Sequence, residues 1–193
     1  MTPNRGVRTS VTDPIRVDFL PDDDALGPGR LGMTFAPGKK GPGVAGNWER
    51  DLDADLDRLD HEYDARMLVS LLRPSEYALL GIEDLADRAT AHQLDFHAFP
   101  ITDAGVPSSV ASSATLVQML LVRVRSGDIV VVHCRGGLGR AGLVAACCLT
   151  AVGYDAERAI ATVREVRSPS AIETLGQEDF IVDFADEWSR PSQ

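Results

Sequence analysis

The most informative part of the chain is the stretch IVVVHCRGGLGRAG, residues 129–142. Its apolar start predicts a buried strand, and the apolar run of residues 143–149 that follows predicts a buried helix. Between them the glycines allow turns with positive φ, so that successive backbone N–H groups face one concavity. The positive end of the helix dipole lies beneath it. The sequence therefore predicts an anion-binding loop suited to a phosphate dianion.

Two side chains of this loop indicate phosphate chemistry. Cys134 lies at the mouth of the loop, where N–H groups that bind phosphate also stabilise a thiolate, the nucleophilic form of cysteine. Arg140, six positions later, is placed to return across the loop and hold two phosphate oxygens with its planar guanidinium. We assign phosphate binding to Arg135, Gly136, Gly137, Leu138, Gly139 and Arg140.

Cleavage of a phosphate ester also needs a general acid, because the leaving alkoxide or phenoxide must be protonated. Our candidate is Asp103. It lies in the stretch FPITDAGVP, residues 99–107, where a predicted strand runs into a loop that contains Pro and Gly. A carboxylate on such a loop can swing over a bound phosphate.

These residues carry a family resemblance. His133-Cys134-x5-Arg140 resembles the signature loop of the cysteine-dependent protein phosphatases, both tyrosine-specific and dual-specificity. More narrowly, GGLGR (136–140) followed by LVAAC (143–147) resembles the kinase-associated, cyclin-dependent kinase inhibitor 3-like dual-specificity phosphatases, which act on cyclin-dependent kinases. The resemblance implies a protein phosphatase fold, a phosphocysteine intermediate and a phosphorylated protein as partner and substrate.

The resemblance also implies roles for further residues. Residues 100–107 resemble the Pro-Ile-x-Asp-x-Gly-x-Pro acid loop of this family, so that the acid role carries over to Asp103. His133 would form a hydrogen bond near the backbone of the nucleophile and tune its thiolate. Residues 167–177 resemble the segment Arg-x3-Ala-Ile-x-Thr-x2-Gln, which implies that Gln177 orients the attacking water. The alternative for Gln177 is a polar residue on a helix face.

The chain departs from the family at Ala141, where the family has Ser or Thr directly after the loop arginine. In the family that hydroxyl stabilises the thiolate and helps it leave when the phosphocysteine is hydrolysed. Loss of one such donor lowers a rate by about 10² to 10³. We expect Cys134 to accept phosphoryl groups still, with breakdown of the intermediate limiting kcat. The alternative is a phosphoprotein-binding pseudophosphatase with weak or no turnover.

Other interpretations of the loop and its surroundings stay open at this point. Rhodanese-type sulfurtransferases also place a cysteine in an anion-binding loop, but they lack an upstream acid in a Pro-Ile-x-Asp setting. Lys39 and Lys40, the only lysines, lie in a Gly/Pro-rich loop, residues 36–46, that could border the site and meet an acidic substrate. An exposed turn with two charges is the simpler interpretation. The sequence does not separate phosphotyrosine from phosphoserine or phosphothreonine.

The rest of the chain predicts one α/β domain, since 193 residues can bury a sizeable core. Residues 1–26 predict an extended or mobile N-terminal arm, with a short strand at 15–20 as the alternative, and residues 27–190 the catalytic domain. Strands that alternate with helices imply a central, mostly parallel sheet flanked by helices. We expect strands at 31–35, 67–72, 94–99 and from 129, and helices at 82–91, 109–125, 156–166 and 173–188, besides an apolar helical stripe from Trp48 to Tyr63.

Composition limits the function classes. The net charge of −10 disfavours nucleic acid and anionic membranes as partners. We find no apolar signal, no membrane-spanning stretch and no lipidation motif, so we expect a soluble protein. Three cysteines without metal-ligand spacing predict neither a disulfide framework nor a metal, and no cofactor is needed. A reducing cytoplasm suits the thiol, and Cys147 and Cys148 are expected in the core. The oligomeric state stays unknown.

Overall fold

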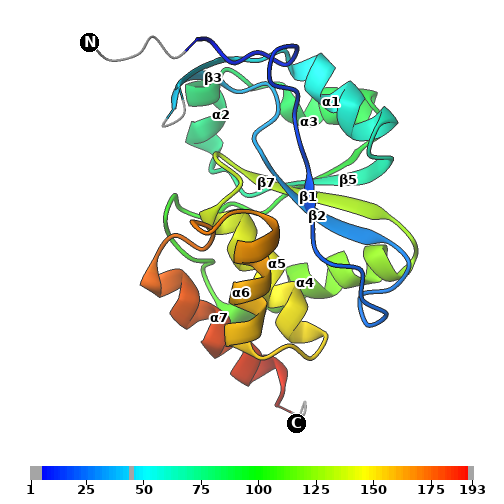
Figure 1. The fold of residues 1–193 in the computed structure, drawn as a ribbon, viewed down its shortest axis with the longest axis vertical. Helices are drawn as coiled ribbons and strands as arrows, with labels where there is room; N and C mark the ends of the chain where they lie inside the picture. Colours follow the sequence, from blue (N-terminus) through cyan, green and yellow to red (C-terminus); the bar gives the residue numbers. More distant parts are fainter. Residues whose placement is uncertain (1–5, 44–45, 191–193) are drawn as a thin grey trace.

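The computed structural model describes residues 6–43 and 46–190, and it confirms the predicted α/β fold (Figure 1). A five-stranded sheet with the order β1-β2-β7-β5-β6 forms its centre. Neighbouring strands run parallel except at the edge, where β1 is antiparallel to β2. The strands of this sheet are β1 (Asp18–Phe19), β2 (Arg30–Phe35), β5 (Ala65–Ser70), β6 (Asp95–Ala98) and β7 (Ile129–Cys134).

Helices cover both faces of the sheet (Figure 1). One face carries α1 (Leu52–His61), α2 (Pro74–Leu80) and α3 (Leu85–Ala91). The other face carries α4 (Val110–Arg125), α5 (Gly139–Ala151), α6 (Ala156–Val166) and α7 (Leu175–Trp188). Within residues 6–43 and 46–190, no helix is long and apolar enough to cross a membrane.

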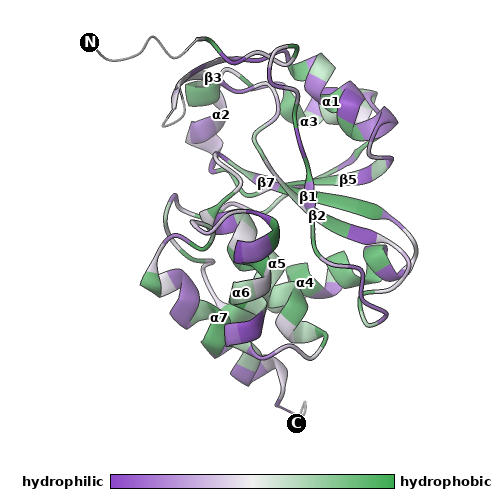
Figure 2. Cartoon of the chain, in the orientation of Figure 1, coloured by the Kyte–Doolittle hydropathy of each residue, from purple (hydrophilic) through white to green (hydrophobic). Residues whose placement is uncertain are grey.

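The position of β7 in the middle of the sheet explains why its sequence is a continuous apolar run. Val130 and Val132 belong to the hydrophobic cluster beneath α4 to α7, whereas Val131 belongs to the cluster beneath α1 to α3. Successive side chains of a strand point to opposite faces, so a strand covered on both faces needs apolar residues at every position. Figure 2 shows hydrophobic residues along β5 and β7 and hydrophilic ones over much of α1.

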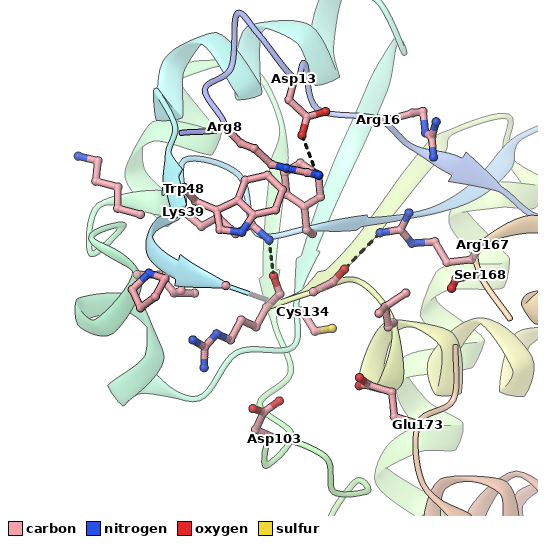
Figure 3. Close-up of a pocket in the computed structure, with 18 of the residues that line it drawn as sticks. Arg8, Asp13, Arg16, Lys39, Trp48, Asp103, Cys134, Arg167, Ser168 and Glu173 are labelled. Atoms are coloured by element: carbon pink, nitrogen blue, oxygen red, sulfur yellow. Dashed lines mark hydrogen bonds and ion pairs between the residues drawn. The ribbon is translucent and has the colours of Figure 1, made fainter. Parts of the chain in front are cut away.

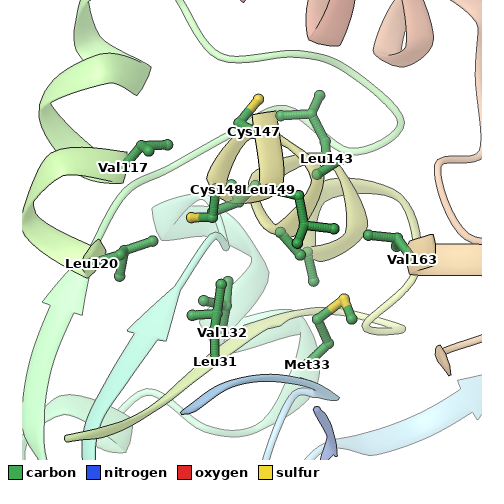
Figure 4. Close-up of a cluster of buried hydrophobic side chains, with 14 of the residues drawn as sticks. Leu31, Met33, Val117, Leu120, Val132, Leu143, Cys147, Cys148, Leu149 and Val163 are labelled. Atoms are coloured by element: carbon green, nitrogen blue, oxygen red, sulfur yellow. The ribbon is translucent and has the colours of Figure 1, made fainter. Parts of the chain in front are cut away.

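Helix α5 is the most deeply buried helix next to β7. All residues from Gly139 to Thr150 are buried, and the helix packs against α4, α6 and α7. Cys147 and Cys148 lie inside this cluster, which confirms the prediction that they are core residues (Figure 4). Burial raises the pKa of the Cys148 thiol to about 12 and that of Cys147 well above its ordinary value. Neither thiol is therefore ionised near neutral pH.

The predicted loop of residues 36–46 is wrong in part, because its end forms a β-hairpin. Strand β3 (Lys40–Gly43) pairs with β4 (Gly46–Glu49) as a separate two-stranded sheet. Trp48 lies in β4 opposite Gly41, so it does not start the helix as expected. Helix α1 begins after Asp51, whose side chain accepts the Ala54 N–H at 2.8 Å and so caps the helix.

A further helix boundary differs from the expectation, and one helix was missed. The expected helix at 82–91 begins only at Leu85, and α2 was not predicted at all. Seven residues are too short to show a helical period, but Pro74 occupies the first turn and Gly81 ends the helix with a φ of +64°. These two residues were the available signal.

The described part of the N-terminal segment, residues 6–26, packs on the domain. Ile15, Val17, Leu20 and Leu26 are buried in the two hydrophobic clusters. The short strand in this segment covers only Asp18–Phe19, within the alternative range of residues 15–20. Residues 1–5 lie outside the described part, and the division at residue 27 stays a prediction.

Candidate active site

The loop between β7 and α5 has the conformation that its glycines predict. Cys134 ends β7, and its Sγ atom accepts the Gly137 N–H at 3.2 Å. Gly137 has a φ of +71°, and a Cβ atom there would lie 2.3 Å from the Thr34 carbonyl oxygen. Glycine is therefore required at position 137, and its N–H points to the sulfur that would carry a phosphoryl group.

Arg140 lies in the first turn of α5 and is 1% exposed. Its guanidinium donates to both carboxylate oxygens of Glu76, at 2.7 and 2.9 Å. It also donates to the carbonyls of Leu71 and Ile101, at 3.3 and 3.0 Å. The Nη2 atom additionally donates to Oδ1 of Asp103 at 2.7 Å. These contacts fix the plane of the guanidinium and bring two of the predicted catalytic residues together.

Glu76 is a site residue that the sequence analysis missed. It lies in the first turn of α2, and its carboxylate also accepts the Arg73 N–H at 2.9 Å. Burial alone would raise the pKa of Glu76, but hydrogen bonds from Arg140 and Arg73 outweigh it and lower that pKa below 4.5. The Glu76 carboxylate is therefore charged near neutral pH and is the counter-ion of the buried Arg140 guanidinium. Its only sequence signal was the short helix start at Pro74.

Asp103 lies on a loop that reaches over the site from the end of β6. Its side chain is 60% exposed, and its Oδ1 accepts from Arg140. The loop turns at Ala104 and Gly105, and Gly105 donates to the Thr102 carbonyl at 2.9 Å. Figure 3 shows Asp103 facing the same cavity as Cys134. This is the placement that a proton donor needs.

Gln177 is fully buried at the start of α7 and tethers this loop. Its Nε2 donates to the Gly105 carbonyl at 3.0 Å, and its Oε1 accepts the Glu173 N–H at 2.8 Å. Thr174 adds a second tether to the carbonyl of Ala104 at 3.4 Å. The Gln177 amide thus tethers the loop that carries Asp103, and both its nitrogen and its oxygen contact backbone atoms.

His133 lies in the core behind the loop. Burial lowers the pKa of His133 to about 4, so its ring is neutral near pH 7. Among the described residues neither ring nitrogen has a partner at full hydrogen-bond geometry, but the Cys134 backbone interacts with the ring and raises the pKa of His133 against the effect of burial. The hydrogen bond expected near the Cys134 backbone therefore stays a prediction. Ala141, two residues into α5, is buried and brings no hydroxyl to the loop.

Arg167 is a second residue whose role was missed. Its Nε donates to the Gly137 carbonyl at 2.8 Å. Its Nη2 donates to the Gly136 carbonyl at 3.2 Å, the contact drawn as a dashed line from Arg167 in Figure 3. A third contact, to Asp18 at 2.5 Å, ties the arginine to β1. The carbonyls of the loop are thus held outside, which directs the N–H groups of the same peptides inward.

A cavity of about 810 Å³ opens above Cys134. Its basic lining residues are Arg8, Arg16, Lys39, Lys40, Arg135 and Arg167, and its acidic ones are Asp13, Asp103 and Glu173. The chain as a whole has 29 acidic and 19 basic residues, whereas basic residues outnumber acidic ones in the cavity lining. Among the residues described, His, Cys, Asp and Glu form no cluster of three or more that could hold a metal ion.

Comparison with known families agrees with this geometry. Residues 63–181 match the model of the Swiss Army Knife protein, DSP-PTPase phosphatase domain. The chain belongs to the DSP-PTPase phosphatase family. The match contains the strand, loop and helix around Cys134, together with Glu76, Asp103 and Gln177.

Individual relatives point the same way. The chain is 29% identical over 175 residues to cyclin-dependent kinase inhibitor 3 of Rattus norvegicus, covering 90% of this chain and 80% of that protein. The human protein of the same name is 30% identical over 158 residues, with 81% and 72% covered.

Solved structures confirm the fold. A structure of kinase associated phosphatase, with its catalytic cysteine replaced by serine, superimposes with a TM-score of 0.83 at 26% identity and covers 92% of this chain and 98% of that one. The Tk-PTP structure in its active form matches with a TM-score of 0.65 at 27% identity, with 82% and 92% covered. This DSP-PTPase chain thus has the fold of a protein phosphatase, as the sequence predicted, and its relatives support phosphatase activity in general.

Proposed function

We propose that this member of the family hydrolyses phosphotyrosine, phosphoserine or phosphothreonine monoesters in proteins through a phosphocysteine on Cys134. One observation carries the proposal. Cys134, whose sulfur accepts the Gly137 N–H, and Asp103, which accepts from Arg140, line the same cavity. A nucleophile, an oxyanion site and a proton donor are the three groups that this reaction needs.

In the first step the Cys134 thiolate attacks phosphorus. The S–P bond forms, and the bond from phosphorus to the leaving oxygen breaks. The N–H groups of loop residues 135–140 and the Arg140 guanidinium hold the equatorial oxygens. Asp103 donates its proton to the leaving oxygen, so that an alcohol or phenol departs.

Asp103 has to leave the Nη2 atom of Arg140 before this step, because an incoming phosphate oxygen competes for the same N–H groups. Its side chain is largely exposed, and the loop stays tethered through Gly105 to Gln177. Substrate binding therefore exchanges a carboxylate for a phosphate on Arg140 and releases the acid toward the leaving group.

In the second step water attacks the phosphocysteine. Asp103, now a carboxylate, accepts a proton from the water, the S–P bond breaks, and the thiolate and inorganic phosphate are released. Gln177 assists by keeping the acid loop above the sulfur and, through its amide, by placing the water. No metal or cofactor takes part in these steps.

The cavity supports a phosphoprotein as partner. Its volume of about 810 Å³ accommodates a phosphorylated side chain with adjoining peptide, and its basic lining attracts the phosphate to a chain with a net charge of −10. We place the catalytic unit in residues 27–190. The free thiol of Cys134 suits a reducing compartment, and we therefore retain the cytoplasm as the proposed location.

Ala141 favours a second candidate, a phosphoprotein-binding pseudophosphatase. Its methyl group is buried beside the loop, where it donates no hydrogen bond to the sulfur. A chain that binds phosphate at the loop without releasing it from Cys134 would capture phosphoproteins rather than turn them over.

Steady-state hydrolysis of an aryl phosphate between pH 5 and 8 separates the two candidates. Turnover by the wild type that is lost in Cys134→Ser supports the phosphatase. No turnover, with binding of a phosphopeptide that Arg140→Ala abolishes, supports the pseudophosphatase. Equal turnover by the wild type and Cys134→Ser contradicts the proposed mechanism.

A further inference from the structure

Lys39 is a buried lysine beside the phosphate loop. It directly precedes β3 and is 7% exposed. Its Nζ atom lies 3.9 Å from the centroid of the Trp48 ring and 4.4 Å from that of the Phe35 ring. It donates to the carbonyl oxygen of Arg135 at 3.2 Å, and Arg135 directly follows the nucleophile (Figure 3).

The contact of Lys39 with the Arg135 carbonyl affects the direction of the next N–H group, which would bind phosphate. The carbonyl of residue 135 and the N–H of Gly136 belong to one planar trans peptide and point in opposite directions. Holding the carbonyl toward Lys39 therefore turns the Gly136 N–H to the opposite side of this peptide. Arg167 does the same for the next two peptides, and the result is visible in the Gly137 N–H that reaches the Cys134 sulfur.

The charge of Lys39 has no carboxylate partner among the described residues. Its neighbour Arg50 uses both oxygens of the buried Asp55, at 2.7 and 2.8 Å. A buried ammonium is costly without an anion, and aromatic faces offset only part of that cost. The anion that the site itself supplies is the thiolate of Cys134.

The charged groups that act on Lys39 come from several elements. The pKa of Lys39 falls to about 7 as the net effect of these groups: burial lowers it most, the charge of Arg50 lowers it next, the charge of Cys134 raises it, and Arg167 and Arg135 lower it. The groups concerned are Arg50, Cys134, Arg135 and Arg167. Lys39 and Cys134 line the same cavity, so an ammonium on Lys39 and a negative charge on the sulfur attract each other there.

We propose that Lys39 is a positioning residue of the active site, whose ammonium orients the Arg135–Gly136 peptide and stabilises the Cys134 thiolate. This inference rests on the proposed role of Cys134 as nucleophile. It concerns how the thiolate is formed, so it can be tested without turnover.

The first experiment measures the rate at which iodoacetamide alkylates Cys134 between pH 5 and 8. Lys39→Met keeps the length of the side chain and removes its charge. We expect roughly tenfold slower alkylation at pH 6, as a one-unit change in thiol ionisation gives, and a profile displaced to higher pH. Cys147 and Cys148 are buried, and Cys134→Ser supplies the background rate.

Lys40 provides the matched control. It is the next residue and the only other lysine, it is exposed, and its side chain lies against Gly81 rather than the loop. Lys40 also lines the cavity, so Lys40→Met controls for the loss of one positive charge there, and it should displace the alkylation profile less than Lys39→Met does. A folded Lys39→Met protein with the profile of the wild type overturns the proposal.

A second measurement keeps the proposal testable if Lys39→Met does not fold. In Lys40→Arg, Lys39 is the only lysine, so its ¹³Cε NMR signal is unambiguous after selective labelling. We expect its titration midpoint to fall when Cys134→Ser is added, because the thiolate no longer stabilises the ammonium. An unchanged midpoint contradicts the proposal. If the wild type shows no aryl phosphatase activity but the Lys39 midpoint still falls in Cys134→Ser, only the proposed function is contradicted.

Discussion

At the scale of single residues, the site is organised around one arginine that serves two purposes. Arg140 holds the general acid candidate Asp103 and is itself held by Glu76. Cys134, the proposed nucleophile, and Arg140 are six residues apart and could be predicted from spacing. The role of Glu76 and the contacts of Arg167 and Lys39 with the loop could not, because the partners lie far apart in sequence and only the folded sheet brings them together.

Glu76→Gln tests whether the fixed guanidinium matters. Gln keeps the size of the side chain but removes the charge and one of the paired acceptors, so Arg140 is no longer held in one plane. We expect kcat/KM for an aryl phosphate to fall by roughly 10²-fold, as a misplaced catalytic group gives. The exposed Glu83→Gln is the matched control. Equal losses in both variants would contradict this role of Glu76.

The same pair predicts how stability depends on pH. The pKa of Glu76 is lower in the folded chain than its ordinary 4.5, so the unfolded chain binds more protons near that pH. The stabilisation by Glu76 is therefore complete above pH 4.5 and is lost as the pH falls through the lower folded pKa. Urea unfolding between pH 3 and 6 should show a smaller loss in Glu76→Gln than in the wild type. Parallel curves would refute this linkage.

Asp103→Asn separates proton transfer from phosphate binding. An amide cannot protonate the leaving oxygen, so kcat for a phosphopeptide should fall by about 10² to 10⁴. The variant also lacks the negative charge that competes with phosphate for Arg140. Vanadate, measured by its inhibition of aryl phosphate hydrolysis, should therefore bind as tightly as to the wild type or more tightly. Normal kcat, or much weaker vanadate binding, would reject the assignment.

At the scale of elements, the phosphate loop between β7 and α5 was predictable because its signals are local. The apolar strand, the glycines and the apolar helix follow one another within residues 129–151. The hairpin β3–β4 and helix α2 were not predicted, since four-residue strands and a seven-residue helix are too short to show a period. Trp48 matched the apolar helical stripe by its spacing, but it lies in strand β4, where it pairs with Gly41.

Gly137→Ala tests the conformation of this loop. The added Cβ would lie 2.3 Å from the Thr34 carbonyl oxygen at a φ of +71°, so the loop has to rearrange. We expect loss of activity and a decrease of about 1–3 kcal/mol in the free energy of unfolding. At Gly136 a Cβ meets nothing within 4 Å, so Gly136→Ala should cost less stability. Equal stability losses in urea unfolding would contradict the geometry.

At the scale of the whole molecule, both faces of the sheet are covered and the N-terminal segment completes the cover. The alternation of strands and helices predicted the parallel sheet correctly, because each crossover needs a helix. The packing of residues 15–26 was harder to predict, since their apolar residues show little periodicity and their strand is two residues long. Ile15 and Val17 are buried in the hydrophobic cluster beneath α1 to α3, which residues distant in sequence complete.

Ile15→Ala measures what this segment contributes. Ile15 is fully buried, so the truncation leaves a cavity in the core and should lower the free energy of unfolding by about 2–5 kcal/mol. Val11→Ala, at an exposed position of the same segment, should change it by less than about 0.5 kcal/mol. Urea unfolding is the measurement. A negligible effect of Ile15→Ala would mean that the segment does not stabilise the domain.

Rapid-quench kinetics with an excess of aryl phosphate test the central claim, a phosphocysteine on Cys134, most directly. Because Ala141 brings no hydroxyl to assist the departure of the thiolate, we predict a burst of phenol that approaches one equivalent per enzyme before the steady state. A phosphoenzyme should accumulate with it, both should be absent in Cys134→Ser, and Ala141→Ser should raise kcat. Turnover by the wild type with no phosphoenzyme, together with an unchanged kcat in Ala141→Ser, would contradict the account.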